Sequence, residues 1–199
     1  MRKLLQEMEE YAAKYNVPII NSNGRAVLLD IIKQRKANAV LEIGTAIGYS
    51  TLLLAEHSAA DVKITTLELD KERAAIADSF IARSPFAAQI EIIVGDAAEQ
   101  LLKLTGKYDF VFIDAAKGQY PRYFRSILPL LAKDSVIVAD NVLFRGLVRS
   151  AEPVPHRYRT IVNRLREYID ITMNHPDFVT KIYENGDGLA VSQRKGEVL

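Results

Sequence analysis

Acidic side chains recur at the ends of the short apolar runs of this sequence. Five runs rich in Val, Ile, Leu and Phe each carry a carboxylate near their last residue, at Glu42, Glu68, Asp96, Asp114 and Asp140. A single Asp or Glu at such a place is explained by a turn or a helix N-cap. Five of them indicate a ligand site, because ligands of open α/β sheets bind at the carboxyl ends of the strands.

The first run leads into a glycine-rich loop, "LEIGTAIGYS", which contains Gly44, Gly48 and Ser50. Its spacing is G-x-x-x-G and lacks the third glycine of the dinucleotide motif G-x-G-x-x-G. Glu42, just before Gly44, would repel a pyrophosphate and suits a cation. Glu68 follows Gly44 by 24 residues, where a carboxylate commonly holds a ribose diol. A nucleoside with a positive centre satisfies both observations, and S-adenosylmethionine is such a ligand.

Asp114, Asp140 and Asn141 form a second group of candidate ligands. The two aspartates end successive runs that are separated by one helical segment, so their strands are expected to be neighbours. Their carboxylate oxygens and the Asn141 amide oxygen are hard ligands that suit Mg²⁺, or alternatively Mn²⁺ or Ca²⁺. The alternative interpretation is that Asp114 caps a helix and that Asp140 and Asn141 belong to an ordinary turn.

The elements that must position these side chains follow a simple alternation. Two helices are expected first, over residues 1–16 and 21–36, and then apolar strands alternate with helical segments, which indicates a parallel sheet covered on both faces. We therefore predict an α/β fold with a mostly parallel, doubly wound sheet. The whole chain, 1–199, is expected to be one domain, with N-terminal helices over 1–36 and the core over 37–199. The expected strands are 38–44, 63–69, 90–96, 108–114 and 135–141, and the expected helices among them are 48–58, 70–83, 97–104 and 118–131.

The C-terminal part departs from this alternation. A basic helix is expected over residues 156–173, and two strand-like runs follow within residues 178–193. They are joined by Asn185, Gly186, Asp187 and Gly188, a composition typical of a hairpin turn. We expect this hairpin to add antiparallel strands to the edge of the sheet.

The composition excludes several classes of protein. The sequence has no cysteine, so it cannot form disulfides or thiolate metal sites, and its three histidines lack metal-ligand spacing. The formal net charge is +1, which gives no overall preference for an anionic partner. The N-terminal segment is charged throughout and unlike a signal peptide, and no apolar run reaches membrane-spanning length. We expect a cytoplasmic protein without a membrane partner.

Five motifs together resemble those of the cation-dependent O-methyltransferases, the group that includes catechol and caffeoyl-CoA O-methyltransferases. The motifs are "LEIGTAIGYS", "LELD", "GDAAEQL", "FIDAAKGQY" and "VIVADNVLFRG", and the resemblance extends from about Asn21 to Ser192. It implies the Rossmann-like fold of S-adenosylmethionine-dependent methyltransferases and a homodimer. The N-terminal helix is expected either to cover the cofactor or to lie in the dimer contact. The long acceptor-binding insertion of the plant enzymes is absent, which argues against bulky CoA esters as substrates.

The resemblance also implies a role for individual residues. Lys117 would be the catalytic lysine, acting either as a base or as a fixed positive charge; the alternative is a solvated helix lysine. Asp114 would serve the metal, the catalytic centre and the cofactor amino group, and Asp140 and Asn141 would complete the metal ligands. The implied cofactor residues are Glu42 and Gly44 at the methionine part, Glu68 at the ribose, Asp96 and Ala97 at the adenine, and Gly48, Ser50 and Asp114.

The positive charge of the chain is concentrated near the predicted site. Between Arg122 and Arg166 there are nine basic and three acidic residues. Candidates for contacts with RNA phosphates and an unpaired base follow the last predicted parallel strand. They are Arg145, Arg149, His156, Arg157, Tyr158 and Arg159. A basic solvated helix face, or a subunit contact, is the alternative interpretation.

Within the family, "DNVLFRG" followed by "PVPHRYRTIVNRLREY" is most similar to the bacterial branch that methylates 5-hydroxyuridine at the tRNA wobble position. Our first hypothesis is therefore methylation of a tRNA anticodon loop, and our second is methylation of a small catechol. Catechol and 5-hydroxyuridine both offer two adjacent oxygen atoms to a metal. An NAD-dependent dehydrogenase is disfavoured by the missing third glycine, and a non-catalytic protein by the complete set of Asp114, Lys117, Asp140 and Asn141.

Overall fold

A computed structural model describes residues 1–184 and 186–195 of the chain. Its centre is a seven-stranded sheet with the strand order β3-β2-β1-β4-β5-β7-β6. The strands β1 to β5 are mutually parallel wherever they pair, which confirms the predicted α/β fold. The strands are β1 (Ala39–Ile43), β2 (Lys63–Glu68), β3 (Ile90–Val94), β4 (Tyr108–Ile113), β5 (Leu131–Ala139), β6 (Phe178–Tyr183) and β7 (Leu189–Arg194).

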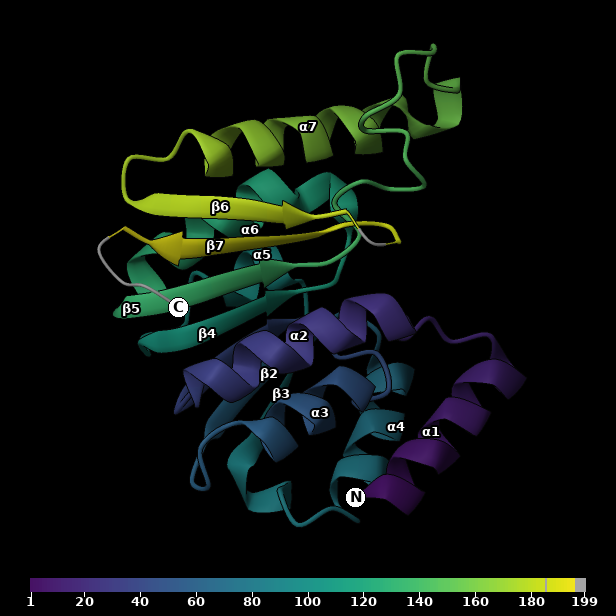
Figure 1. Ribbon diagram of the computed structural model, residues 1–199. Helices are drawn as coiled ribbons and strands as arrows, with labels where there is room; N and C mark the ends of the chain where they lie inside the picture. Colours follow the sequence, from purple (N-terminus) through teal and green to yellow (C-terminus); the bar gives the residue numbers. More distant parts are fainter. Residues whose placement is uncertain (185, 196–199) are drawn as a thin grey trace.

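Helices cover both faces of the sheet, with α2 and α3 in front of it and α5 and α6 behind it in Figure 1. The α-helices are α1 (Arg2–Tyr15), α2 (Ser22–Arg35), α3 (Tyr49–His57), α4 (Lys71–Ile81), α5 (Ala97–Gln100), α6 (Tyr120–Ile127) and α7 (Arg159–Met173). Short 3-10 helices are η1 (Ala87–Gln89), η2 (Lys117–Gln119), η3 (Leu128–Leu130) and η4 (His156–Tyr158).

The central strands divide the core into two layers. Along β4, Phe110 and Phe112 pack into the layer that α1 to α4 cover, while Val111 and Ile113 pack into the layer that α5 to α7 cover. This alternation follows from the two-residue period of a strand, and both layers are apolar because both faces are buried. The sheet is thus doubly wound, as predicted.

Two boundaries differ from the predictions near the end of the parallel part. The helix expected over 118–131 ends at Ile127 and continues as η3, and β5 begins at Leu131 rather than at residue 135. Pro129 explains the change, because a proline has no backbone N–H and cannot extend an α-helix from within.

The C-terminal hairpin is confirmed, with an arrangement that the sequence did not predict. Strand β7 pairs antiparallel with both β5 and β6, so the later strand lies inside the sheet and β6 forms its edge. Asn185 of the predicted turn lies outside the described residues. Of the helices in the part of the chain that the structure describes, none combines the length and the apolar character that a bilayer crossing requires.

Candidate active site

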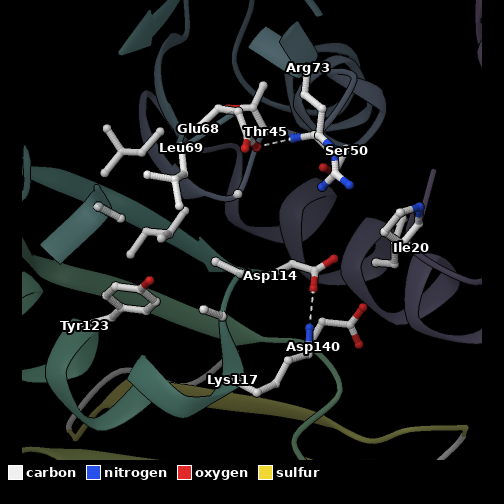
Figure 2. Close-up of a pocket in the computed structure, with 18 of the residues that line it drawn as sticks. Ile20, Thr45, Ser50, Glu68, Leu69, Arg73, Asp114, Lys117, Tyr123 and Asp140 are labelled. Atoms are coloured by element: carbon white, nitrogen blue, oxygen red, sulfur yellow. Dashed lines mark hydrogen bonds and ion pairs between the residues drawn. The ribbon is translucent and has the colours of Figure 1, made fainter. Parts of the chain in front are cut away.

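A cavity of about 490 Å³ opens at the carboxyl ends of the parallel strands. Figure 2 shows Glu68, Asp114, Lys117 and Asp140 around it. Nine predicted site residues line the cavity, and the sequence separates them by up to 97 positions. They are Gly44, Ser50, Glu68, Asp96, Ala97, Asp114, Lys117, Asp140 and Asn141.

Glu68 ends β2, and its carboxylate is held by two backbone N–H groups from different loops. One carboxylate oxygen accepts the N–H of Ala46 at 2.8 Å, and the other accepts the N–H of Asp70 at 2.9 Å. Each carboxylate oxygen can accept more than one hydrogen bond, so both oxygens can still receive a hydroxyl from a ligand. The geometry suits a diol, which agrees with the predicted ribose contact.

Asp96 and Ala97 lie at the neighbouring strand end. The Asp96 carboxylate caps α5 by accepting the N–H of Ala98 at 2.7 Å, and Ala97 begins the helix beside the cavity. Tyr123 of α6, which was not among the predicted site residues, also lines the cavity. Burial, together with the charge of Asp96, raises the pKa of the Tyr123 hydroxyl, which therefore stays protonated.

Two predicted cofactor residues do not reach the cavity. Glu42 is fully buried, and its carboxylate accepts hydrogen bonds from the hydroxyls of Ser50, Thr51 and Thr66. Burial raises the pKa of Glu42 to about 7. Gly48 is the N-cap of α3, with φ 85, and is also absent from the cavity wall. Glu42 supports the loop from beneath, because its side chain points toward α3 and β2 rather than into the cavity.

Gly44 is required by the approach of two strand ends. Its φ is 103, and a Cβ atom there would lie 2.1 Å from the backbone oxygen of Asp114. No L-residue with a side chain fits this position without movement of β1 or β4. Gly44 belongs to the predicted cofactor loop, and its lack of a side chain also lets the backbone of Asp114 lie close to that loop.

Asp114, Lys117, Asp140 and Asn141 meet at the ends of β4 and β5, which pair as predicted. Lys117 Nζ lies 2.8 Å from Asp114 Oδ1, and the Lys117 side chain is 19% exposed, unlike a solvated surface lysine. Asp114 does not cap a helix: neither η2 nor α6 has a side-chain cap. Asn141 adopts a left-handed φ of 55, which asparagine tolerates better than most residues.

The electrostatics of this group favour a cation. Asp140 is only 3% exposed, and burial followed by the charge of Asp114 raises its pKa to about 6. A positive charge between the two carboxylates would relieve both effects. Within residues 1–184 and 186–195, no three His, Cys, Asp or Glu side chains form a metal site on their own. The predicted donor set contains only two carboxylates and depends on the Asn141 amide, and its oxygens are of the type that Mg²⁺ prefers.

The six predicted RNA residues do not line the cavity. Arg149 pairs with Glu184 at 2.9 Å and Arg159 donates to the Val154 carbonyl, so both are engaged within the protein. Arg145 and Arg157 lie over the ring of Tyr158, at 5.7 and 4.6 Å from its centroid, and Arg145 also donates to the Tyr158 hydroxyl at 3.2 Å. His156, Arg157 and Tyr158 form η4, on the loop that leaves Asn141.

The N-terminal linker and Tyr49 contribute cavity residues that were not among the predicted site residues. The linker from Pro18 to Asn21 forms part of the cavity wall. Tyr49 also lines the cavity, and its hydroxyl donates to Glu9 of α1 and accepts from Arg25 of α2. Arg25 in turn pairs with Glu9 at 2.6 Å. These contacts join α1 and α2 to the cavity wall, although their positions are far from the motifs in the sequence.

A family model for O-methyltransferases matches residues 1–195. The chain belongs to this O-methyltransferase family. A catechol O-methyltransferase from Niastella koreensis is 36% identical over 150 residues, which cover 71% of this chain and 68% of the relative. Caffeoyl-CoA O-methyltransferase 2 from Petunia hybrida is 30% identical over 173 residues, which cover 83% of this chain and 71% of the relative.

The fold is also found in solved structures of this kind. The O-methyltransferase from Bacillus cereus in complex with S-adenosylhomocysteine has a TM-score of 0.86 and 28% identity, and the match covers 97% of this chain and 91% of that chain. The family match and this neighbour confirm the predicted Rossmann-like methyltransferase fold and the assignment to an S-adenosylmethionine-dependent O-methyltransferase family.

Proposed function

We propose that this protein transfers the methyl group of S-adenosylmethionine to a hydroxyl of an acceptor that chelates a divalent cation through two adjacent oxygen atoms. The observation that carries the proposal is the placement of Asp114, Asp140 and Asn141 in the same cavity as Glu68 and Asp96. When bound, the cofactor supplies an electrophilic methyl group, and the cation supplies the Lewis acidity that lowers the pKa of the acceptor hydroxyl.

One side of the cavity would bind the cofactor, and the other side would bind the cation. Glu68 would accept the ribose hydroxyls, and Asp96 and Ala97 would border the adenine. Asp114, Asp140 and Asn141 would hold the cation. Gly44 and Ser50 would lie along the methionine part. Orientation by such fixed groups is a large source of rate enhancement, up to about 7–11 kcal/mol in well-oriented reactions.

Lys117 is the side chain that can act on the acceptor proton. Its ammonium group lies 2.8 Å from Asp114 Oδ1, inside the cavity wall. As a neutral amine Lys117 would accept the proton of the acceptor hydroxyl, and as a cation it would stabilise the resulting oxyanion. Both roles need the position beside Asp114, which the ammonium form keeps by an ion pair and the neutral amine can keep by a hydrogen bond.

A small catechol is the acceptor class that the relatives favour. The Niastella koreensis relative is named a catechol O-methyltransferase, and the cavity of about 490 Å³ must hold both cofactor and acceptor. Catechol presents two adjacent oxygens on a compact ring, so it satisfies the chelation requirement with little volume.

A 5-hydroxyuridine in a tRNA anticodon loop is the second acceptor class. It presents the same oxygen pair, and the stack of Arg145, Tyr158 and Arg157 favours it. In the part of the chain that the structure describes, neither the Arg145 side chain nor the Arg157 side chain pairs with a carboxylate, although the backbone N–H of Arg145 donates to Asp187. An arginine–aromatic stack of this type suits an unpaired base and its phosphates.

One transfer assay separates these acceptors. The protein is incubated with S-adenosylmethionine labelled in the methyl group and offered catechol or tRNA that carries 5-hydroxyuridine, each with Mg²⁺ or with EDTA. We expect transfer that requires Mg²⁺. Transfer that persists in EDTA contradicts the cation, and transfer to catechol alone contradicts the tRNA acceptor.

A double substitution, Arg145→Ala with Arg157→Ala, tests the tRNA acceptor separately. If these side chains neutralise phosphates, the slope of log affinity for tRNA against log salt falls by about 0.7 for each arginine removed, while catechol transfer is unchanged. The matched control is Arg125→Ala with Arg164→Ala, which removes two arginines that pair with Glu167. An equal decrease of tRNA affinity in both variants would assign the effect to net charge alone.

The predicted homodimer and the predicted cytoplasmic location stay predictions. Light scattering of the purified protein measures whether it forms a dimer.

A further inference from the structure

Tyr120 is a fully buried residue beneath the ends of β4 and β5. Its hydroxyl donates to the backbone oxygen of Asp140 at 2.9 Å and lies 3.2 Å from the backbone oxygen of Ile113. The Ile113 oxygen also accepts the N–H of Asp140 at 2.9 Å. The hydroxyl therefore meets both strand ends next to the two aspartates of the cavity, since Asp114 directly follows Ile113.

The ring of Tyr120 is fixed by its surroundings. It packs edge-on against Tyr168 of α7, with 5.5 Å between ring centroids, and Lys117 Nζ lies 5.8 Å from the Tyr120 centroid on the cavity side. Tyr120 thus touches the backbone of Asp140 and the side chain of Lys117 without lining the cavity itself. It can act on the site only through these neighbours.

We propose that Tyr120 is a positioning residue that sets the spacing of Asp114 and Asp140 for a divalent cation. This inference rests on the proposed function. The hydrogen bond from the Tyr120 hydroxyl to the backbone carbonyl of Asp140 limits rotation of that peptide group, and so it helps to fix the direction of the Asp140 side chain. Removal of a group that hydrogen-bonds to a metal-ligating residue and orients it commonly weakens metal binding by about 10–100-fold.

Tyr168 provides a matched control in the same layer. It is also a fully buried tyrosine, its ring touches Tyr120, and among the described residues its hydroxyl has no hydrogen-bond partner. Tyr120→Phe and Tyr168→Phe each remove one buried hydroxyl and keep the ring. Only the first removes a hydrogen bond to Asp140.

The test measures Mn²⁺ affinity by the electron paramagnetic resonance signal of free Mn²⁺, with S-adenosylhomocysteine present at saturation. We expect Tyr120→Phe to weaken Mn²⁺ binding about tenfold and Tyr168→Phe to leave it unchanged. S-adenosylhomocysteine affinity, measured by calorimetry, should change far less than Mn²⁺ affinity in both variants, because Glu68 and Asp96, at other strand ends, keep their contacts.

Unchanged Mn²⁺ affinity in Tyr120→Phe, with binding to the natural sequence intact, overturns the role of Tyr120 alone. An equal decrease in both variants also overturns it, because the effect would then belong to packing. Absence of Mn²⁺ binding to the natural sequence refutes the cation of the proposed function and removes the basis of this inference with it.

Discussion

The two sides of the cavity satisfy their carboxylates in opposite ways. On the cofactor side, Glu68 and Asp96 accept hydrogen bonds from backbone N–H groups. Glu42, which lies beneath the loop and outside the cavity, accepts three hydrogen bonds from hydroxyls. On the acceptor side, Asp114 is paired with the Lys117 ammonium, and Asp140 is buried with a pKa raised to about 6 by burial and by Asp114.

The difference shows what each side can bind. Carboxylates whose position is set by backbone donors offer their remaining lone pairs to neutral hydroxyls, such as those of a ribose. Two carboxylates close together, one of them buried, favour a cation, because a positive charge stabilises their ionised forms. The comparison therefore predicts that a substitution on one side impairs the ligand of that side and leaves the other ligand in place.

The largest effect is expected for Asp140→Ala, which removes a proposed cation ligand. Lewis-acid stabilisation contributes several kcal/mol, so kcat/KM should fall roughly 10³-fold. S-adenosylhomocysteine affinity should change little, because the cofactor side keeps its hydrogen bonds. Initial rates over a Mg²⁺ series and calorimetry of S-adenosylhomocysteine measure the two quantities. Full Mg²⁺-dependent activity would refute Asp140 as a ligand.

The next effect concerns Glu42 and the stability of the protein. Its pKa is raised from 4.5 to about 7 by burial, so between these values the folded protein holds a proton that the unfolded chain has released. The contribution of Glu42 to the free energy of unfolding is largest below pH 4.5 and falls as pH rises to about 7. The total change is about 3 kcal/mol.

Glu42→Gln should remove this part of the pH dependence, because an amide does not titrate there. Urea unfolding of both proteins at several pH values between 4.5 and 8 measures it. The raised pKa of Asp140 contributes a slope of the same sign to both proteins and cancels in the difference. Parallel stability curves would show that the pKa of Glu42 is the same in the folded and unfolded protein, which contradicts the shift.

The smallest of these effects is expected for Glu68→Gln. A hydrogen bond to a charged acceptor contributes about 1.5–3 kcal/mol, so the KM for S-adenosylmethionine should rise by about 10–100-fold. Mn²⁺ affinity should stay unchanged in Glu68→Gln, just as S-adenosylhomocysteine affinity should stay nearly unchanged in Asp140→Ala. Weaker Mn²⁺ binding in Glu68→Gln would show that the two sides are coupled and that the distinction between them is wrong.

The order of residues along the chain was enough to predict the parallel sheet and nine of the residues that line the cavity. Asp114 and Asp140 follow apolar strands that flank one helical segment, and this order indicated that β4 and β5 are neighbours. Glu68 and Asp96 were found in the same way. These predictions succeeded because local periodicity sets the strands, and parallel strands place their carboxyl ends at one edge.

The directions of the side chains, and the distant segments that reach the cavity, depend on the tertiary structure. The Glu42 side chain points away from the cavity, toward three hydroxyls on α3 and β2, because successive residues of β1 alternate between the two faces of the sheet. The linker from Pro18 to Asn21 and the hydroxyl of Tyr120 meet the site through packing between elements distant in sequence. No local pattern encodes such contacts, since they depend on how whole helices pack onto the sheet.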